Sequence, residues 1–462
     1  MNPVPPPTTL HDARRQIRIR HLEQLSHANI TLTSPEDDEE TSILPSCKIF
    51  RAELKKWSQD HMKSIQEAIS KSKSTCDDLF LPYRKLIILD RCPEWQREYR
   101  LELLLLGFYG EHDCLSEVGR APMKHSGLAN DEYHGSRDWD KLHDAVQLYK
   151  SVKAGTSPNG DLHQVHDLYE QSVEGIKEVA AVWGMDFMQI CEHILKKAHQ
   201  GHSDKNPKWN GPFCGAFFPK DHEQGAPYVG ITFKGTDPKN IKDINVDSSF
   251  DPIQVDAKHL FGTVVSEGVY NALFGTFNKD SVSPFELILK ALQDFVPKLN
   301  VEDNTEPLLH VTGHSLGGSY SSFCFAQLMM QNASLPAGAR LGDLYNFGSP
   351  RVGQKAWSQA FYENLCGNFP GGAWRIVNDK DIVPQVPSLL KYKPKTGPFY
   401  HIDNGIQIFK EAKPAPIETE RNGPGNVDIG FTRFGFVRRL ATQTYHYPPS
   451  YYHAMEYALA NQ

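Results

Sequence analysis

A short polar turn between two apolar segments constrains this chain more than any other feature of its sequence. The turn reads Gly-His-Ser-Leu-Gly, has Ser315 at its centre, and separates residues 308–312 from residues 319–330. The first segment has the length of a buried strand and the second has the length of a helix. Side chains two residues before and after the serine would collide in such a turn, so glycine is needed at 313 and 317. We therefore predict a tight strand-turn-helix unit with the Ser315 hydroxyl clear of the sheet.

This unit has the form of a nucleophile elbow. The hydroxyl would lie at a helix N-terminus, where exposed amides stabilise negative charge, and the N–H of Leu316 would point at a carbonyl oxygen under attack. A serine hydroxyl does not ionise by itself, so a histidine must take its proton and a carboxylate must hold that histidine in one tautomer. We expect Ser315 as nucleophile and Leu316 as oxyanion donor, with the acid and the histidine following in that order along the chain.

Strand-like and helix-like segments alternate over the second part of the chain. A helix is expected over residues 163–199, with a break at Gly184, and helices also over 319–330 and 353–365. Short apolar runs predict strands at residues 213–218, 228–233, 308–312, 344–347, 374–377 and 399–402. Alternation of this kind is typical of an α/β protein with a mostly parallel central sheet covered on both faces.

The first third of the chain has a different pattern. Residues 1–45 are rich in Pro, Thr, Asp and Glu and are expected to form a partly ordered N-terminal arm. Residues 46–160 carry apolar positions at helical spacing, for example over 47–71, and predict a helical extension or cap. Turn residues at 155–160 suggest the boundary of an α/β domain over residues 161–462.

Composition excludes several classes of protein. Of the 462 residues, 39% are hydrophobic and 23% charged, values typical of a folded globular chain. The net charge of -7 gives no basic surface for nucleic acid. No apolar run approaches the ~20 residues of a transmembrane helix, and the N-terminus lacks the apolar core of a secretory signal, so a cytoplasmic location is expected. The eight cysteines form no CxxC pair, which favours reduced thiols over a metal site.

Candidates for the acid and the base lie downstream of Ser315. Asp379 and Asp381 both follow the predicted strand at 374–377. Three histidines, His401, His446 and His453, lie near the C-terminus. His401 falls on a predicted strand, where a histidine is more often a packed residue than a base. His446 precedes two prolines, and His453 begins a helical run.

Five blocks of sequence, in order, carry a resemblance to a known family. They are YVGITFKGTD (228–237), VTGHSLGG (311–318), YNFGSPRVG (345–353), WRIVNDKDIVPQVP (374–387) and the histidine-containing C-terminus. Over roughly its last 290 residues the chain resembles the class 3 lipases, the α/β-hydrolase family of fungal triacylglycerol lipases and their plant relatives. The resemblance implies an α/β-hydrolase fold, preceded here by the helical N-terminal extension.

The resemblance also implies particular site residues. The family pattern NxxDxVP selects Asp381 as the acid, and a terminal histidine followed closely by tyrosine selects His453 as the base. The loop after residues 228–233 places a second oxyanion donor at Thr236. The family commonly has arginine where Lys234 stands, and lysine cannot make the bidentate contacts of a guanidinium.

The expected activity is that of a serine carboxylester hydrolase of lipase type, which cleaves acyl esters of glycerolipids through an acyl-enzyme. Its partner is a lipid or other ester substrate, in solution or at a lipid–water interface, and the chemistry needs no metal or organic cofactor. A phospholipase, a galactolipase, a small-ester esterase and a non-catalytic lipase-like regulatory protein are the alternatives. The sequence does not determine the ester, the acyl position or the oligomeric state.

Two regions bear on access to the predicted site. Where fungal relatives carry a mobile lid, this chain has only a thin apolar edge, Ile241, Ile244 and Val246, so weak interfacial activation is expected. Apolar residues of the extension, such as Trp57 and Ile65, must be buried against another surface. A fixed cap on the α/β domain and an independent helical module are both compatible with this pattern.

Overall fold

The computed structural model describes the chain in separate stretches. They are residues 6–27, 139–156, 162–174, 177, 185–195, 198–199, 202–203, 208–219, 228–235, 250–276, 282–299, 306–368, 372–387, 398–402, 405–417, 445–446, 450–451, 454–455 and 457.

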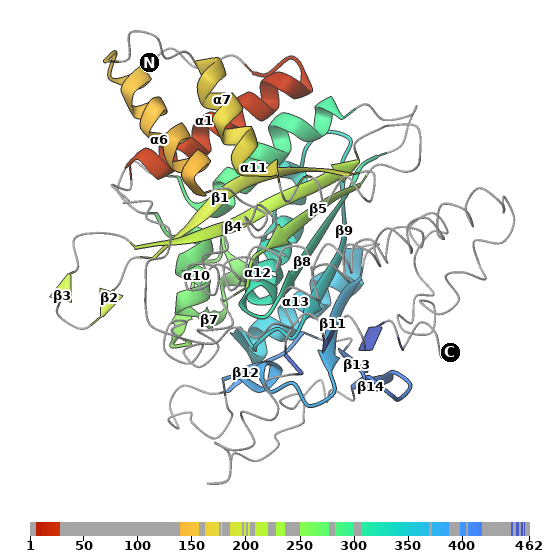
Figure 1. Ribbon diagram of the computed structural model, residues 1–462. Helices are drawn as coiled ribbons and strands as arrows, with labels where there is room; N and C mark the ends of the chain where they lie inside the picture. Colours follow the sequence, from red (N-terminus) through yellow and green to blue (C-terminus); the bar gives the residue numbers. More distant parts are fainter. Residues whose placement is uncertain are drawn as a thin grey trace, which may run out of the picture.

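A central sheet organises the described part of the chain (Figure 1). Its eight strands lie in the order β1-β4-β5-β8-β9-β11-β13-β14. Their bounds are β1 Met185–Leu195, β4 Lys208–Pro219, β5 Tyr228–Phe233, β8 Leu308–His314, β9 Arg340–Phe347, β11 Ala373–Asn378, β13 Gly405–Ile408 and β14 Ala415–Ile417. The strands from β5 to β13 pair in parallel, whereas β1, β4 and β14 are antiparallel to their neighbours. The predicted mostly parallel sheet is confirmed.

Helices connect and cover these strands. They are α1 Leu10–His27, α6 Trp139–Lys153, α7 Leu162–Ser172, α10 Glu267–Phe274, α11 Pro284–Phe295, α12 Leu316–Met330 and α13 Lys355–Asn368. Short 3-10 turns occur at Leu260–Gly262, Val296–Lys298, Asn332–Ser334 and Val383–Gln385. Helix α12 leaves the end of β8 and packs against β5, β8 and β9. A parallel sheet with helical crossovers, antiparallel strands at both edges and an elbow at the end of β8 is an α/β-hydrolase fold, as predicted.

Two smaller sheets complete the described strands. One has the order β12-β10-β7-β6, and the other pairs β2 with β3. Their bounds are β6 Pro252–Gln254, β7 Val264–Ser266, β10 Gly353–Gln354, β12 Phe399–Tyr400, β2 Ala198–His199 and β3 His202–Ser203.

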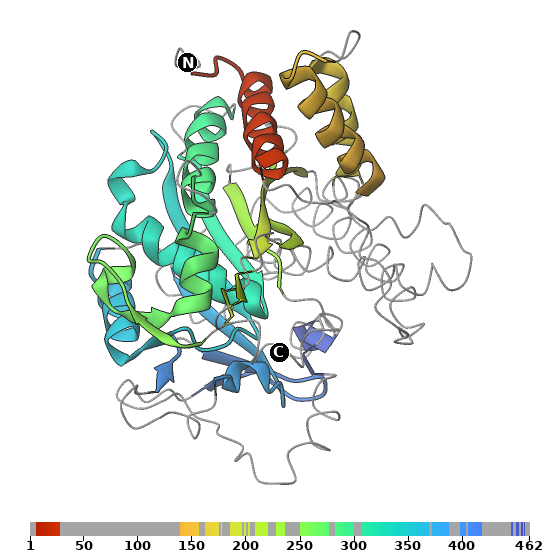
Figure 2. The same ribbon diagram turned by 90° about the vertical axis from the view of Figure 1, so that its left-hand side faces the viewer.

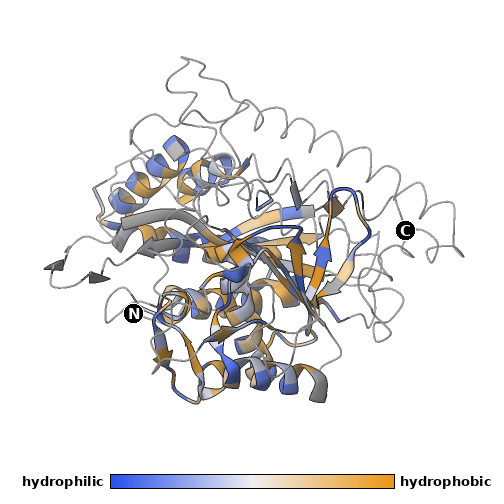
Figure 3. Ribbon diagram, turned by 90° about the horizontal axis from the view of Figure 1, so that it is seen from below, coloured by the Kyte–Doolittle hydropathy of each residue, from blue (hydrophilic) through white to orange (hydrophobic). Residues whose placement is uncertain are grey.

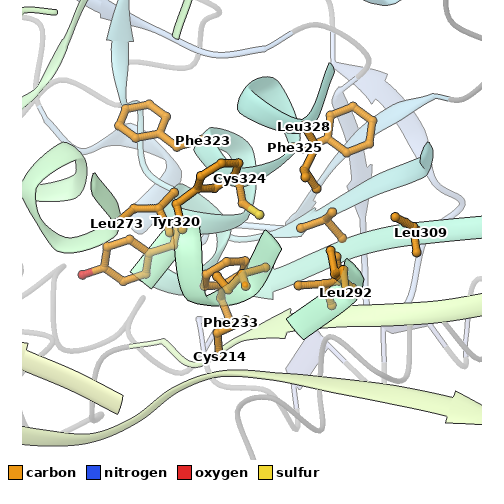
Figure 4. Packing of buried hydrophobic residues seen from close by; sticks show 14 of the residues in the cluster. Cys214, Phe233, Leu273, Leu292, Leu309, Tyr320, Phe323, Cys324, Phe325 and Leu328 are labelled. Carbon is orange, nitrogen blue, oxygen red and sulfur yellow. The ribbon is translucent and has the colours of Figure 1, made fainter. Parts of the chain in front are cut away.

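The core lies around α12, which is buried along almost its whole length. Aromatic rings from α12 and from the neighbouring strands pack against one another there (Figure 4). The Tyr320 ring meets that of Phe213 edge-on, with centroids 4.7 Å apart. In Figure 3 the central strands and the inner sides of the helices are the most hydrophobic parts of the described chain. Polar side chains of α12 are buried with the apolar ones, and Ser321 and Ser322 donate to the Gly318 carbonyl of the same helix.

The long helix predicted over 163–199 is wrong in its second half. Helix α7 ends at Ser172, and Met185–Leu195 form β1, which pairs antiparallel with β4. Phe187, Met188 and Ile190 are all buried. Adjacent residues of a strand point to opposite faces, and both faces of β1 carry buried residues, so the apolar positions of this run do not alternate strictly. Such a run cannot be distinguished from a buried helix by periodicity alone.

A helix occupies most of the described part of the N-terminal arm. Leu10–His27 form a helix, α1, where a partly ordered arm was predicted. Ala13 and Ile17 of α1 are buried in the main core, and Leu22 and Leu25 are buried against α6 and α7. The helix is stabilised because its apolar residues pack into two separate clusters. These few apolar residues are difficult to recognise in a segment with many charged residues.

Helix α1 lies between α11 and the α6–α7 pair (Figure 2). Arg20 of α1 forms an ion pair with Asp294 of α11 at 2.6 Å, and Arg14 pairs with Asp186 of β1 at 2.8 Å. The turn at 155–160, predicted to be a domain boundary, separates α6 from α7, which share one hydrophobic cluster. The helical unit thus includes α7 and is packed on the α/β domain through α1, whereas Trp57 and Ile65 lie outside the described residues.

Candidate active site

The elbow has the geometry that its sequence predicts. Ser315 lies between β8 and α12 with φ 57° and ψ -130°. A Cβ on Gly313 would be 2.3 Å from the carbonyl oxygen of Gly317, and a Cβ on Gly317 would be 2.4 Å from that of Phe233. The Ser315 N–H donates to the carbonyl of Phe347 at 2.8 Å. Glycine is needed at both positions because backbone lies in direct contact there.

The Ser315 hydroxyl does not cap the helix that it precedes. Its Oγ lies 2.8 Å from Nε2 of His446 instead. Both residues are buried, and each is 1% exposed. A serine hydroxyl in contact with an imidazole nitrogen, at the start of a helix, is the first half of a nucleophile–base pair.

Asp381 completes the hydrogen-bonded chain. Its Oδ2 lies 2.8 Å from Nδ1 of His446, and its Oδ1 accepts the N–H of Val383 at 2.9 Å. Because a buried carboxylate accepts from Nδ1–H, the Nε2 lone pair faces the Ser315 hydroxyl. The order nucleophile, acid, base along the chain is the one expected for the fold.

Asp379 has a different position. It has a φ of 40°, is partly exposed, and receives a hydrogen bond from Gln407 at its backbone carbonyl. Its N–H donates to the carbonyl of Ile408 at 2.8 Å. Asp379 is therefore the turn residue between β11 and the loop that carries Asp381.

The histidine predicted from the sequence needs correction. The structure places His446 between Ser315 and Asp381. His453 itself lies outside the described residues. The family's terminal histidine followed closely by tyrosine favoured His453 in the sequence, but hydrogen bonds from distant segments hold the turn at 445–446 against the elbow.

Two side chains from the sheet anchor that turn. Asn378, the last residue of β11, donates through Nδ2 to the carbonyl of Tyr445 at 2.8 Å and to the hydroxyl of Ser450 at 2.9 Å. His314, the last residue of β8, lies with Nε2 2.8 Å from the carbonyl oxygen of His446. These contacts join residues 67 to 132 positions apart in the sequence.

His401 is packed rather than placed at the site. Its Nε2 lies 2.5 Å from the carbonyl oxygen of Pro384, next to the turn that carries Asp381. Burial, and then the charges of Arg375 and Arg351, hold the pKa of His401 well below its ordinary value. The ring is therefore neutral at physiological pH, as suits a structural residue.

Tyr451 is a site residue that the sequence reasoning missed. Its hydroxyl donates to Asp381 Oδ2 at 2.5 Å, on the oxygen that also receives His446. Burial, and then the Asp381 carboxylate, raise the pKa of Tyr451 well above its ordinary value, so the hydroxyl stays protonated and remains a donor. The tyrosine-rich segment TYHYPPSYYH was the available signal, but nothing in it distinguishes Tyr451 from its neighbours.

Gly348 lies directly behind the acid and the base. A Cβ at this position would be 2.7 Å from Asp381 Oδ2, 2.7 Å from the Tyr451 hydroxyl and 3.1 Å from His446 Cε1. Its φ of 58° is in the left-handed region, which favours glycine. The close packing of these groups therefore requires a glycine after β9.

The oxyanion side is described only in part. Leu316 is the first residue of α12, so its N–H belongs to the unpaired amides of a helix N-terminus beside Ser315. The end of β5 lies against the elbow, because a Cβ on Gly317 would approach Phe233 and Lys234. Lys234 is buried and donates its N–H to the carbonyl of Phe213 at 3.1 Å. Thr236, the predicted second donor, lies outside the described residues, as does the predicted lid edge at Ile241.

The described residues contain neither a cluster suited to a metal ion nor a helix suited to a membrane. No group of three or more His, Cys, Asp or Glu side chains in them has an arrangement that would hold a metal ion. Among the helices that the structure describes, none is long and apolar enough to cross a membrane. Three cysteines whose side chains the structure describes, Cys191, Cys214 and Cys324, are buried free thiols.

Part of the chain is similar to known lipases. Residues 230–391 match the family model of lipase (class 3), which confirms the predicted resemblance over that segment. The chain is 34% identical over 95 residues to secreted mono- and diacylglycerol lipase 1 of Fusarium solani, which covers 21% of this chain and 25% of that protein. It is 26% identical over 212 residues to triacylglycerol lipase OBL1 of Arabidopsis thaliana, covering 42% and 39%. The matches thus span between a quarter and two fifths of these two relatives.

Solved structures similar to this chain are also fungal lipases. The native lipase propeptide complex of Rhizomucor miehei has a TM-score of 0.30 and 18% identity, covering 58% of this chain and 65% of that one. Lipase II from Rhizopus niveus has a TM-score of 0.31 and 15% identity, covering 63% and 88%.

Proposed function

We propose that the protein is a serine carboxylester hydrolase in which Ser315 is the nucleophile, His446 the general base and Asp381 the residue that orients the base. The observation that carries this proposal is the continuous chain of hydrogen bonds through the three side chains. His446 lies 2.8 Å from Ser315 Oγ on one side and 2.8 Å from Asp381 Oδ2 on the other. This chain of hydrogen bonds is buried and starts at a nucleophile elbow, where a serine is activated by a neighbouring base.

The reaction follows from these positions. Nε2 of His446 accepts the Ser315 proton as Oγ attacks the ester carbonyl, and the Asp381 carboxylate stabilises the imidazolium that forms. Negative charge develops on the carbonyl oxygen, and the N–H of Leu316 at the start of α12 supplies a donor for it. His446 then gives its proton to the departing alcohol, leaving an acyl ester on Ser315. Water attacks this ester by the same route, which releases the acid and restores the serine.

Thr236 completes the oxyanion hole in this proposal. It follows β5, whose end packs against Gly317 beside the nucleophile. A donor from the loop after this strand would reach the carbonyl oxygen from the side opposite Leu316.

The proposed substrates are acyl esters of glycerolipids. The class 3 lipase match over residues 230–391 supports this class, and the curated relatives carry lipase names. A phospholipase, a galactolipase or a small-ester esterase would use the same three residues, because the triad determines ester attack and not the acyl or alcohol group. A lipase-like protein without turnover is the alternative from another class.

Covalent labelling tests the nucleophile. A fluorophosphonate probe should label the wild-type protein at one site, and Ser315→Ala should remove both the label and ester hydrolysis, because the nucleophile is lost. Ser319→Ala is the matched control, since Ser319 is a buried serine of α12 whose Oγ has no hydrogen-bond partner in the described structure. It should label and turn over like wild type. Hydrolysis by folded Ser315→Ala protein would refute the proposal, and an unlabelled wild type would favour the non-catalytic alternative.

A second pair of variants tests the base. His446→Ala should lose turnover as completely as the serine variant, because members of a triad act as a unit. His453→Ala should keep turnover. The reverse result would restore the residue that the sequence suggested.

A substrate panel then distinguishes the ester classes. Triacylglycerols, phospholipids, galactolipids and short p-nitrophenyl esters, each at several chain lengths, would be compared by kcat/KM. Highest values on acylglycerols are expected. A preference for a polar headgroup or for the shortest esters would replace the proposed substrate class and leave the chemistry unchanged.

A further inference from the structure

The residue before the nucleophile has contacts that the proposed reaction does not use. His314 is the last residue of β8 and is 2% exposed. Its Nε2 lies 2.8 Å from the backbone carbonyl oxygen of His446, and its ring stacks on the His446 ring with centroids 4.6 Å apart and an interplanar angle of 27°. One side chain therefore contacts both the backbone and the imidazole of the proposed base.

The hydrogen bond determines the tautomer of His314. A carbonyl oxygen only accepts, so the nitrogen that contacts it must carry the proton. His314 is accordingly protonated at Nε2 and donates to the loop. The stacked ring limits rotation of the His446 ring out of its plane, and the hydrogen bond fixes the backbone from which that ring extends.

Such restraint matters because His446 belongs to a turn and not to a regular element. The described turn residues at 445–446 are held by Asn378 through the carbonyl of Tyr445 and by His314 through the carbonyl of His446. The base has to keep two hydrogen bonds of 2.8 Å at once, to Ser315 and to Asp381. A displacement of about 1 Å at a reacting group can cost on the order of a hundredfold in rate.

We propose that His314 is a positioning residue for the base: its Nε2–H holds the His446 backbone, and its ring holds the plane of the His446 imidazole. The proposal rests on the function proposed above, since it assigns His446 as the base. His314 touches neither the substrate nor the transferred proton in this scheme, and it acts through His446.

Two substitutions separate the hydrogen bond from simple filling of space. His314→Gln places an amide N–H near the position of Nε2 but has no ring. His314→Phe keeps a ring on His446 and has no donor. If His314 merely fills space, phenylalanine is the better replacement, whereas the proposal requires glutamine to be the better one.

The test measures kcat and KM on an ester that the wild type hydrolyses. His314→Phe should lower kcat about tenfold, the factor that corresponds to one hydrogen bond, with KM within about twofold of wild type. His314→Gln should recover at least a third of wild-type kcat. His310→Asn is the matched control on the same strand, because His310 is buried and accepts the Asp343 N–H through Nδ1 at 2.8 Å, remote from the triad. It should retain wild-type kcat.

Wild-type kcat in His314→Phe, or equal losses in the phenylalanine and glutamine variants, would overturn the proposal. Nuclear magnetic resonance of ¹⁵N-histidine-labelled wild-type protein gives a result that needs neither variant to fold well nor any turnover. The His314 ring should carry a proton on Nε2, and an Nε2 without a proton would also overturn the proposal. An inactive, unlabelled wild type with the expected tautomer would instead mean that the proposed function fails.

Discussion

Replacement of Tyr451 by phenylalanine removes one hydroxyl from the buried acid of the proposed triad. Asp381 accepts three hydrogen bonds, from His446, Val383 and Tyr451, and the tyrosine donates at 2.5 Å to the same oxygen as the histidine. Asp381 is 1% exposed and Tyr451 is fully buried, so water cannot take the place of the lost donor without a rearrangement. The substitution leaves the ring, and hence most of the packing, in place.

The magnitude follows from these contacts. A hydrogen bond to a charged group contributes roughly 1.5–3 kcal/mol, so Tyr451→Phe should lower the free energy of unfolding by about 2 kcal/mol. In a domain of about 300 residues that corresponds to a fall in Tm of roughly 3 °C. Two of the three donors remain, so Asp381 stays near its position but has more freedom to rotate. We expect kcat to fall about tenfold, equivalent to about 1.4 kcal/mol in the activation barrier.

Tyr345→Phe supplies the matched control. The Tyr345 hydroxyl donates to Asp343 at 3.0 Å, and both residues are buried on β9 away from the triad. Thermal unfolding and steady-state ester hydrolysis would be measured for both variants. Both should lose stability, but only Tyr451→Phe should lose kcat. An equal loss of kcat in the two variants, or a kcat for Tyr451→Phe within twofold of wild type, would show that the hydroxyl does not support the acid.

Three further predictions concern the surroundings of the site. Gly348→Ala should abolish most turnover and lower Tm, because its Cβ would meet Asp381 and Tyr451. Gly338→Ala is the control: Gly338 has a φ of 78° and open space around it, so this variant measures only the loss of stability from placing alanine at a positive φ. Ile17→Ala should lower the free energy of unfolding, measured in urea, by about 2–5 kcal/mol, because Ile17 is buried in the core. A decrease below about 0.5 kcal/mol would mean that α1 does not pack on the sheet in solution. Below about pH 6.5 unfolded His401 binds a proton that the folded, low-pKa ring does not, so this residue makes stability fall as pH falls. Between pH 7 and pH 5 the free energy of unfolding of His401→Gln should therefore fall by about 2 kcal/mol less than that of wild type. The same fall in both proteins would contradict the low pKa of folded His401.

Local sequence was sufficient wherever neighbouring residues decide the structure. The elbow could be predicted in part because a Cβ on Gly313 would meet the Gly317 carbonyl within the same turn, whereas the close contact at Gly317 is with the end of β5. The strand at 228–233 was predicted with its observed bounds. The strand at 374–377 left two candidate acids after it, Asp379 and Asp381, and the family pattern selected Asp381. Each of these features depends on contacts within a few residues or on a run long enough to show its period.

The base and the outer elements were decided by tertiary structure. His446 and His453 are seven residues apart, and the choice between them depends on hydrogen bonds from Asn378 and His314, which are 67 and 132 residues from the groups they bind. In the same way, β1 is a strand because β4 pairs with it, and α1 is ordered because two cores enclose it. Sequence patterns indicate which side chains are suited to burial. They do not indicate which distant segment buries them or which loop reaches the nucleophile, because those contacts form only when the chain folds.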